Sequence, residues 1–544
     1  MTEHSFFRAA APAILFACAV AVIAAAWWWM GAAVPMPQSP LASGEKLYCV
    51  SYAPFRGTQS PLTPPIMIET VQIEEDLARL SQTTDCIRTY AIEFGLDRIA
   101  EVAKRHGMKV IQGIWLSGNP EKNKVEIDTA VRLAKQYPDT IRALVVGNEV
   151  LLRGEMSAQN LAATIRDVKR QTNLPVTYAD VWEFWLRYRD VYDAVDFVTI
   201  HILPYWEDFP ISARDSVSHL DDIRKKVAAA FPNKDILIGE TGFPSAGRMR
   251  EGALPSPSNQ AQVIQGIIAL SKRDNFRVNV IEAFDQPWKR KLEGTVGGHW
   301  GLFDAYSRTM KFAWGEPVSD HPFWQQQIAG GVMMAALVFI AAMLGRFRTK
   351  EPMISPALRW VSVGGVAALA GTFVPLAVEK VPLESLGIGG WVRSGILLLL
   401  AIGCPLAVAA ALTRQRAITT FANILTWPLR SFECRLIPVV GFLLVVLTLV
   451  SLQVALGLVF DPRYKDFPYA PLSAAIGSLF ILSLFQNAAN APRALAEQIA
   501  AGVLALSLIY ILFNESFLNW QAVWLCGLLA ALAFTLSTVR DARG

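Results

Sequence analysis

The stretch ILIGETGFPS, residues 236–245, decides the fold class of this chain. Its first residues are apolar and mostly β-branched, and the run ends on Glu240 before glycine and proline interrupt it. This pattern predicts a buried parallel strand that carries a carboxylate at its carboxyl end. The stretch IRALVVGNE, residues 141–149, has the same form and ends on Glu149. The carboxyl ends of the strands form the reactive face of an α/β barrel, so we expect both glutamates on one rim.

Residues 45–320 alternate between predicted strands and predicted helices around these two stretches. We expect strands over residues 46–55, 85–92, 109–116, 141–149, 175–182, 194–205, 236–240 and 278–285. Helices are expected between most of them, over residues 68–81, 96–105, 124–136, 158–172, 212–230 and 259–272. Eight strand repeats in a segment of this length predict an α/β fold, a (β/α)8 TIM barrel.

The amino-terminal segment is predicted to be a membrane helix. Residues 1–34 begin with a polar, charged stretch and continue as an apolar run that contains three consecutive tryptophans. This run is long enough to cross a bilayer, and tryptophan is favoured at the membrane interface. A cleaved signal peptide is the alternative, but we favour a retained signal anchor because the run exceeds the usual apolar core of a signal peptide. Residues 35–44, rich in proline and serine, are expected to form a linker.

The composition changes again in residues 321–544. Apolar stretches lie at residues 328–344, 360–378, 396–412, 439–460, 470–484, 499–513 and 523–537. Each is near the length that crosses the hydrocarbon of a lipid bilayer, which predicts an all-α, multi-span transmembrane domain of about seven helices. The barrel is therefore expected to be fused to a membrane domain.

Positive charges gather in alternate loops of this domain and at the end of the chain. They are Arg346, Arg348, Lys350 and Arg359, then Arg414, Arg416, Arg430 and Arg435, then Arg493, and finally Arg540 and Arg543. Loops rich in arginine and lysine stay in the cytoplasm. We therefore predict a multi-pass protein of the cytoplasmic (inner) membrane, with both termini cytoplasmic and the barrel on the periplasmic or extracellular side.

The overall composition limits the possible functions. Hydrophobic residues make up 53% of the chain, which is too much for a soluble enzyme alone. The net charge is only +4 and no basic cluster is interleaved with aromatic residues, so we expect no nucleic-acid partner. The 6 cysteines form no CxxC motif. Cys49 and Cys86 fall on the first two predicted strands, where a disulfide and two free buried thiols are both possible.

Two glutamates on one rim are the groups that glycosidic bond cleavage by paired carboxylates requires. A single glutamate at a strand end is usually solvated or paired with an arginine, but two in matching barrel positions argue against that interpretation. A calcium site would need more oxygen ligands than these stretches offer. We therefore expect neither a metal nor a cofactor.

Four short motifs carry a resemblance to a known family. They are GNE at 147–149, GETGFPS at 239–245, IRTY at 87–90 and EAFDQPWK at 282–289. Together they resemble glycoside hydrolase family 17, the β-1,3-glucanase and β-1,3-glucan transferase family. The resemblance covers residues 45–315 and implies a retaining barrel enzyme acting on β-glucan, with Glu149 as acid/base and Glu240 as nucleophile. Gln286 departs from the family pattern, because related sequences often carry glutamate there.

Further residues are expected to bind the sugar. Asn148 is placed to hydrogen-bond the sugar 2-hydroxyl. Tyr205 resembles the tyrosine that orients the nucleophile in the wider clan, and Arg88 either pairs with an active-site carboxylate or forms a structural ion pair. The other candidates, which either bind sugar or pack the barrel, are Tyr52, Tyr90, Trp115, Asp180, Trp182, Trp288 and Lys289. We interpret His201 and His299 as hydrogen-bonding groups of the rim, since no third metal ligand is evident.

The covalent intermediate of such an enzyme can be released by water or by another sugar hydroxyl, and the sequence leaves both open. The membrane domain favours a transglycosylase that remodels newly made β-1,3-glucan or branches it through β-1,6 links, beside a membrane glucan synthase. A tethered hydrolase is the alternative. An export or binding protein is less favoured, because the predicted helices contain few charges and Glu497 and Glu515 lie near helix ends.

Overall fold

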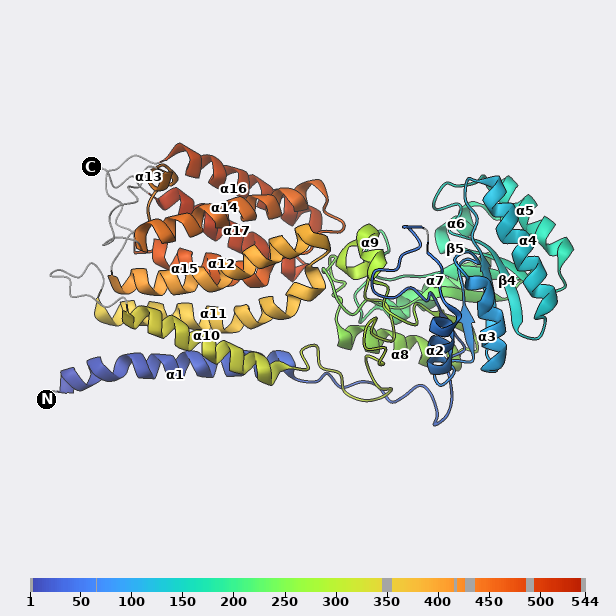
Figure 1. The fold of residues 1–544 in the computed structure, drawn as a ribbon, viewed down its shortest axis with the longest axis horizontal. Helices are drawn as coiled ribbons and strands as arrows, with labels where there is room; N and C mark the ends of the chain where they lie inside the picture. Colours follow the sequence, from blue (N-terminus) through green and yellow to red (C-terminus); the bar gives the residue numbers. More distant parts are fainter. Residues whose placement is uncertain are drawn as a thin grey trace. The chain divides into compact units, whose positions relative to one another are not determined.

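Figure 1 shows the fold in a computed structural model, which describes residues 3–64, 66–344, 355–414, 418–425, 436–485 and 494–539. The chain forms two compact units. One unit consists of residues 34–318, and the other combines residues 1–33 with residues 319–544. Each unit has its own large cluster of buried apolar side chains.

The unit of residues 34–318 is a closed barrel of eight parallel strands in chain order, from β1 to β8. The strands are β1 Cys49–Ser51, β2 Cys86–Arg88, β3 Lys109–Ile114, β4 Ile141–Asn148, β5 Val176–Val181, β6 Val198–His201, β7 Ile236–Thr241 and β8 Arg277–Val280. The α/β barrel predicted from the sequence is confirmed, with every strand inside its predicted range or within a residue of it. Several strands are shorter than predicted because an apolar pattern does not show where the hydrogen-bonded ladder ends.

Helices connect the strands and cover the barrel, as α4 and α5 do beside β4 and β5 in Figure 1. They are α2 Thr70–Leu80, η1 Leu96–Arg98, α3 Ile99–Arg105, α4 Pro120–Gln136, α5 Ala158–Gln171, α6 Trp182–Arg187, η2 Arg189–Ala194, α7 Ser216–Ala230, α8 Pro257–Arg273, η3 Pro287–Lys289 and α9 Arg290–Gly297. Asn119, Ser157 and Ser256 cap α4, α5 and α8, each accepting a backbone N–H of the first turn. Proline follows the cap of α4 and α8, where its missing N–H costs no hydrogen bond.

A disulfide joins the first two strands. Cys49 and Cys86 are both fully buried on adjacent strands, with Cα atoms 4.4 Å apart. They belong to a small cluster with Ile111, Val145 and other strand residues, separate from the large core that packs on the helices. Since strand side chains alternate between faces, this cluster fills the barrel interior. Of the two possibilities left open by the sequence, the structure shows the disulfide.

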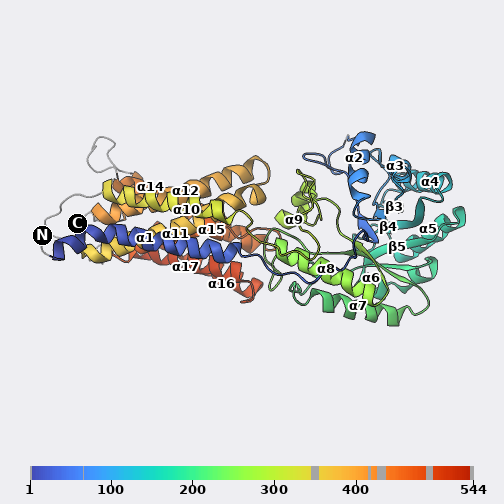
Figure 2. The same cartoon turned by 90° about the horizontal axis from the view of Figure 1, so that it is seen from below.

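The other unit is entirely helical in its described parts. Its helices are α1 Glu3–Gly31, α10 Trp324–Leu344, α11 Pro356–Glu384, α12 Gly387–Arg414, α13 Phe421–Leu425, α14 Leu436–Phe460, α15 Tyr469–Ser483, α16 Leu495–Glu515 and α17 Trp520–Thr538. The amino-terminal α1 packs against α10 and α11, and Figures 1 and 2 both show it alongside them. Among the described helices, seven are long and apolar enough to cross a membrane, α1 among them.

The remaining apolar helix, α15, is shorter than a membrane span. Its 15 residues extend roughly 22 Å at 1.5 Å per residue, less than the ~30 Å of bilayer hydrocarbon. Most of its side chains are buried against α11, α12 and α17. The predicted stretch at residues 470–484 thus forms a helix that is largely buried in the bundle; that it crosses the membrane stays a prediction. Nine of the charged residues used for the topology prediction lie outside the described residues: Arg346, Arg348, Lys350, Arg416, Arg430, Arg435, Arg493, Arg540 and Arg543.

Candidate active site

The backbone at the ends of β4 and β7 directs the two glutamates. Gly147 has a φ of +89°, and a Cβ added there would lie 2.7 Å from Val150. Glu149 itself has a φ of +52°, a conformation that costs an L-residue about 1–3 kcal/mol and persists where the surroundings fix it. The β4–β5 ladder shifts register before Asn148, and the β7–β8 ladder shifts around Glu240. Such irregularities turn side chains away from the regular pleat.

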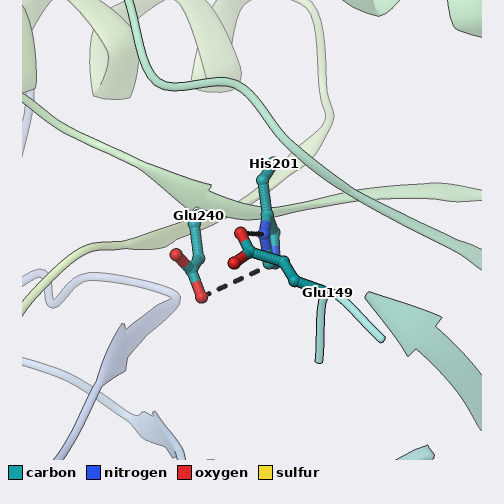
Figure 3. Close-up of side chains that lie close together, drawn as sticks. All are labelled: Glu149, His201 and Glu240. Carbon is teal, nitrogen blue, oxygen red and sulfur yellow. Dashed lines mark hydrogen bonds and ion pairs between the residues drawn. The ribbon is translucent and has the colours of Figure 1, made fainter. Parts of the chain in front are cut away.

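Glu149, His201 and Glu240 converge from three strands, as Figure 3 shows. The Nδ1 atom of His201 lies 2.8 Å from Oε1 of Glu149, and its Nε2 atom lies 3.6 Å from Oε1 of Glu240. One carboxylate oxygen of each glutamate and a ring nitrogen lie within 4.8 Å of one another. The Glu149 side chain is 23% exposed, whereas that of Glu240 is 7% exposed. The pair predicted from the sequence is thus brought together, with only Glu149 partly open to solvent.

Arg88 on β2 contacts Glu240 and Asn148. Its Nη1 donates to Oε1 of Glu240 at 3.0 Å and to the Gly239 carbonyl at 2.7 Å. Its Nη2 donates to Oδ1 of Asn148 at 2.5 Å. Burial alone would raise the pKa of Glu240, but the charges of His201, Arg88 and Lys289 outweigh it and hold that pKa below its usual range. Of the two interpretations for Arg88, the structure shows the ion pair with the active-site carboxylate.

Asp180 on β5 adds a second buried carboxyl beside Glu149. It is 0% exposed, the Tyr178 hydroxyl donates to it, and its other oxygen accepts the Val181 N–H at 2.8 Å. Burial raises the pKa of Asp180 to about 6; the Tyr178 hydrogen bond opposes this effect and the Glu149 charge adds to it. Since Asp180 is fully buried, it acts on the site through Tyr178 and its own charge rather than by touching a substrate.

A further acid and lysine lie on the β8 side. Lys289 Nζ lies 2.8 Å from Oε2 of Glu282, and both side chains are largely buried. Burial raises the pKa of Glu282 to about 7, against the lowering effect of the Lys289 ammonium group. Tyr90, whose hydroxyl lies 2.9 Å from Ser51 Oγ, also helps to lower the pKa of Glu240. The sequence motifs contain all three residues, but only Tyr90 and Lys289 were predicted as site residues; Glu282 was given no role.

Residues 49–301 match the family described as BtgE/BtgC glycoside hydrolase domain. The chain is 28% identical over 263 residues to a glucan 1,3-beta-glucosidase of Candida albicans, covering 44% of this chain and 85% of that protein. It is also 28% identical over 267 residues to a glucan 1,3-beta-glucosidase of Saccharomyces cerevisiae, covering 45% of this chain and 85% of that protein. The barrel is thus similar to the BtgE/BtgC glycoside hydrolase domain and to glucan 1,3-beta-glucosidases.

A solved structure of a glycoside hydrolase family 17 beta-1,3-glucanosyltransferase from Rhizomucor miehei is also similar, with 24% identity and a TM-score of 0.43. The match covers 48% of this chain and 95% of that chain. The family resemblance inferred from the sequence motifs is therefore confirmed by the family match and the fungal relatives. This chain is an enzyme of the glycoside hydrolase type.

Two of the predicted sugar-binding tyrosines are part of the packing of the barrel. Tyr52 is 1% exposed and donates its hydroxyl to Asp76 at 3.0 Å. Tyr205 is 0% exposed and donates to the Arg248 carbonyl at 3.0 Å. Neither ring can stack on a sugar in this arrangement. Among the predicted tyrosines, Tyr90 after β2 is the one that helps to lower the pKa of Glu240.

The three predicted tryptophans keep part of their surface open. Trp115 after β3 is 39% exposed and has the Arg153 guanidinium 4.1 Å from its ring centroid. Trp182 after β5 has Lys226 4.4 Å from its ring, and Trp288 is half-buried beside Phe55. Flat aromatic surfaces of this kind suit the apolar faces of sugar rings. Contact of these three with a sugar stays a prediction.

Glu126, which the sequence analysis missed, holds the loops after β2 and β3. Its buried carboxylate in α4 accepts the backbone N–H groups of Ile92 and Glu93, and that of Trp115 at 3.1 Å. Burial outweighs these bonds and raises the pKa of Glu126. A lone glutamate inside a helix gives no signal of such a role, because the bonds cross to other loops.

A metal ion is poorly matched to this site. Glu149, His201 and Glu240 offer three ligand atoms close enough to surround a cation. The Arg88 guanidinium, however, already lies 3.0 Å from the Glu240 carboxylate, and its positive charge would repel a cation there. We therefore interpret the group as an acid–base and nucleophile arrangement.

Gln286 and the two histidines refine the sequence-based expectations. Gln286 is fully buried, donates to the Ala53 carbonyl at 2.9 Å and accepts from Trp288 Nε1 at 2.8 Å. Its amide therefore uses both a donor and an acceptor, which a glutamate could not do. His201, interpreted from the sequence as a rim group, is instead fully buried between the two glutamates, whereas His299 faces Asp285 at 3.6 Å. No spacing rule in the sequence indicates that β6 turns His201 inward.

Proposed function

We propose that this protein is a membrane-bound retaining glycosidase and transglycosylase that acts on β-1,3-glucan through a covalent glycosyl-enzyme. The proposal rests on one observation above all, the convergence of Glu149 and Glu240 on the rim of a family 17 barrel. The substrate class is supported by the glucan 1,3-beta-glucosidases of Candida albicans and Saccharomyces cerevisiae, of which this chain covers 85%.

The proposed reaction has two steps with Glu149 and Glu240 in separate roles. Glu149 gives its proton to the glycosidic oxygen as the bond to the anomeric carbon breaks, and a Glu240 oxygen bonds to that carbon. Glu149 then takes a proton from an incoming hydroxyl, whose oxygen replaces Glu240. Oxygens of the two carboxylates within 4.8 Å support this retaining route, because inverting enzymes separate theirs by about 6.5–9.5 Å to admit water.

The surroundings favour this division of labour. A nucleophile must be ionised, and the lowered pKa of Glu240 keeps it so. Asn148 has its amide oxygen occupied by Arg88 at 2.5 Å, so the group that it can offer to a sugar hydroxyl is its NH₂. A hydrogen bond to the sugar 2-hydroxyl strengthens in the transition state of glycoside cleavage.

We place the barrel outside the cytoplasmic membrane, with both chain termini in the cytoplasm. This orientation requires an even number of crossings, and so α15 as an eighth span beside the seven long helices. Seven long apolar helices among the described residues support a membrane location, and the arginine-rich loops support this orientation. In that position the enzyme can remodel or branch newly made β-1,3-glucan beside a membrane glucan synthase, adding β-1,6 links, with hydrolysis as a side reaction.

The reaction is tested with the full chain in detergent and a β-1,3-gluco-oligosaccharide of defined length. Products are followed by mass and by linkage analysis. Products longer than the substrate are expected, and a new linkage would identify branching. If every product is shorter than the substrate, the result contradicts transfer and indicates a tethered hydrolase. The Glu240→Gln variant serves as the control, because full glycan processing by that variant would overturn the enzyme in favour of a binding or export protein.

The orientation is tested separately with reporter fusions. Alkaline phosphatase, which is active only outside the cytoplasm, is fused after residue 318 in one strain and within residues 345–354 in another. We expect activity from the first fusion alone. Activity from the second fusion alone would reverse the proposed orientation.

A further inference from the structure

A buried histidine separates the two carboxylates of the site. His201 is the last residue of β6, and its side chain is 0% exposed. Its Nδ1 edge contacts Glu149 at 2.8 Å, while its Nε2 edge faces Glu240 at 3.6 Å (Figure 3). One imidazole ring is thus in reach of the acid/base and of the nucleophile at the same time.

The neighbouring strand leaves space for this ring. A Cβ added at Gly239 would lie 2.4 Å from Thr199 Cγ2 and 3.4 Å from His201 Nε2. The β6–β7 ladder also shifts register between Ile200 and His201, which pairs His201 with Glu240. The position of the ring therefore depends on the backbone of β6 and β7 as well as on its own polar contacts.

Each strand around the ring contributes a charged or titratable group. Arg88 comes from β2, Glu149 follows β4, Asp180 lies on β5 and Glu240 lies on β7. The Arg88 Nη2 atom lies 3.4 Å from His201 Nε2 and shares the Glu240 side of the ring. Among the charges that lower the pKa of Glu240 against its burial, that of His201 is the largest.

We propose that His201 is a positioning residue that serves both steps of the reaction. Its Nδ1 holds Oε1 of Glu149, which leaves the other oxygen to deliver the proton to the glycosidic oxygen and later to accept one. Its Nε2 edge favours the ionised form of Glu240. The inference rests on the proposed retaining function and assigns to it a residue beyond the two glutamates.

The two edges of the ring can be tested separately with near-isosteric variants. In His201→Asn the amide group takes the place of Nδ1, and in His201→Gln it takes the place of Nε2. His201→Ala removes both. Each full-length variant is assayed in detergent on a β-1,3-gluco-oligosaccharide, which needs proton donation, and on a 2,4-dinitrophenyl β-1,3-diglucoside, whose leaving group does not. The pH dependence of kcat/KM is recorded for both substrates.

We expect His201→Ala to lose about 100-fold or more on the oligosaccharide, within the range of general acid catalysis, and much less on the activated glycoside. His201→Asn should recover most of the oligosaccharide activity but show an acidic limb moved to higher pH, because Glu240 has lost its partner. His201→Gln should keep the acidic limb near that of the unmodified enzyme and remain slow on the oligosaccharide.

The inference is overturned if all three variants lose activity equally on both substrates and show no movement of the acidic limb. His201 would then serve only to pack the barrel. Unchanged variants would also overturn the inference. Absence of turnover by the unmodified enzyme on either substrate would instead contradict the proposed function itself.

Discussion

The Arg88 guanidinium lies 3.0 Å from the Glu240 carboxylate, although the two residues are 152 positions apart in the chain. Arg88 is 1% exposed, so both partners of this ion pair are withdrawn from water. The same guanidinium donates to Asn148, which precedes Glu149. One side chain from β2 therefore links the end of β4, next to Glu149, to Glu240 on β7.

Two replacements of Arg88 should separate the effect of its positive charge from the effect of its hydrogen-bonding geometry. We expect Arg88→Met to lower kcat/KM by about 100-fold or more, as when a preorganised donor is removed from a reacting group. The acidic limb of the kcat/KM pH profile of Arg88→Met should move to higher pH, because Glu240 loses a positive charge that lowers the pKa of its carboxyl. Arg88→Lys should keep that limb close to its normal place but lose activity, since an ammonium group cannot hold Glu240 and Asn148 together.

The measurement is the pH dependence of kcat/KM for the three proteins on one oligosaccharide. Arg132→Met, which changes an exposed residue of α4, controls for the loss of positive charge on the barrel. Coincident acidic limbs for the Met and Lys variants would contradict the role of the Arg88 charge.

Asp180 should make the stability of the barrel depend on pH. Its folded-state pKa of about 6 lies above the ~3.9 of an ordinary aspartate. Between those two pH values the folded state binds more protons than the unfolded state. The stabilisation that Asp180 gives to the folded barrel is therefore fully present below pH ~4 and is lost as the pH rises through ~6. It amounts to about 2–3 kcal/mol in the free energy of unfolding.

The free energy of unfolding of the Asp180→Asn variant should therefore not show this decrease between pH 4 and pH 6. Urea denaturation of a barrel fragment, residues 34–318, is compared for the two proteins at intervals from pH 4 to pH 7. Asp190→Asn, at an exposed position, is the matched control and should behave like the unmodified fragment. Parallel stability curves for the Asp180 variant and the unmodified fragment would contradict the assignment.

The fold could be predicted from the sequence because strand and helix periodicities alternate regularly through the barrel. The apolar runs at β4 and β7 end on glutamates, and parallel strands of a barrel present those ends on one rim. The apolar stretch predicted at residues 470–484 likewise matches α15, Tyr469–Ser483, within one residue.

The candidate site was predictable only where a residue lies on a strand with a recognisable motif. Arg88 and Tyr90 were found in this way. Glu126 was missed, and His201 was predicted only as a hydrogen-bonding group of the rim, because their roles arise from contacts across strands and loops, which leave no spacing in the chain. Tyr52 was predicted to bind sugar but is buried in the barrel, because an aromatic residue at a strand end can pack into the core as readily as it can face a ligand.

Gln286 should resist replacement by glutamate, the residue expected at this position from the sequence resemblance. Its NH₂ group donates to the Ala53 carbonyl at 2.9 Å and to the Phe284 carbonyl at 3.2 Å, in a fully buried place. A carboxylate would face both carbonyls without a proton to donate. We expect Gln286→Glu to lower the free energy of unfolding by about 1–3 kcal/mol at neutral pH, the cost of leaving buried groups unpaired.

Thermal unfolding of the barrel fragment is the measurement for this variant. Gln136→Glu, at the exposed end of α4, introduces the same charge on the surface and should leave the Tm nearly unchanged. If both variants shift the Tm equally, the buried hydrogen bonds of Gln286 are not the cause.

The disulfide between Cys49 and Cys86 should make the stability of the barrel depend on redox conditions. It closes a loop between residues separated by 37 positions, which restricts the unfolded chain. Removing it in the double variant Cys49→Ala/Cys86→Ala should lower the free energy of unfolding by about 2–4 kcal/mol. A stable disulfide also fits a barrel outside the cytoplasm, where thiols are not kept reduced.

The barrel fragment and the double variant are unfolded thermally with and without a reducing agent. The reducing agent should lower the Tm of the unmodified fragment towards that of the variant and leave the variant unchanged. The single variant Cys49→Ala should match the double variant, because the loss comes from the link and not from one side chain. Insensitivity of the unmodified fragment to reduction, with mass analysis showing both thiols free, would contradict a stabilising role for this disulfide.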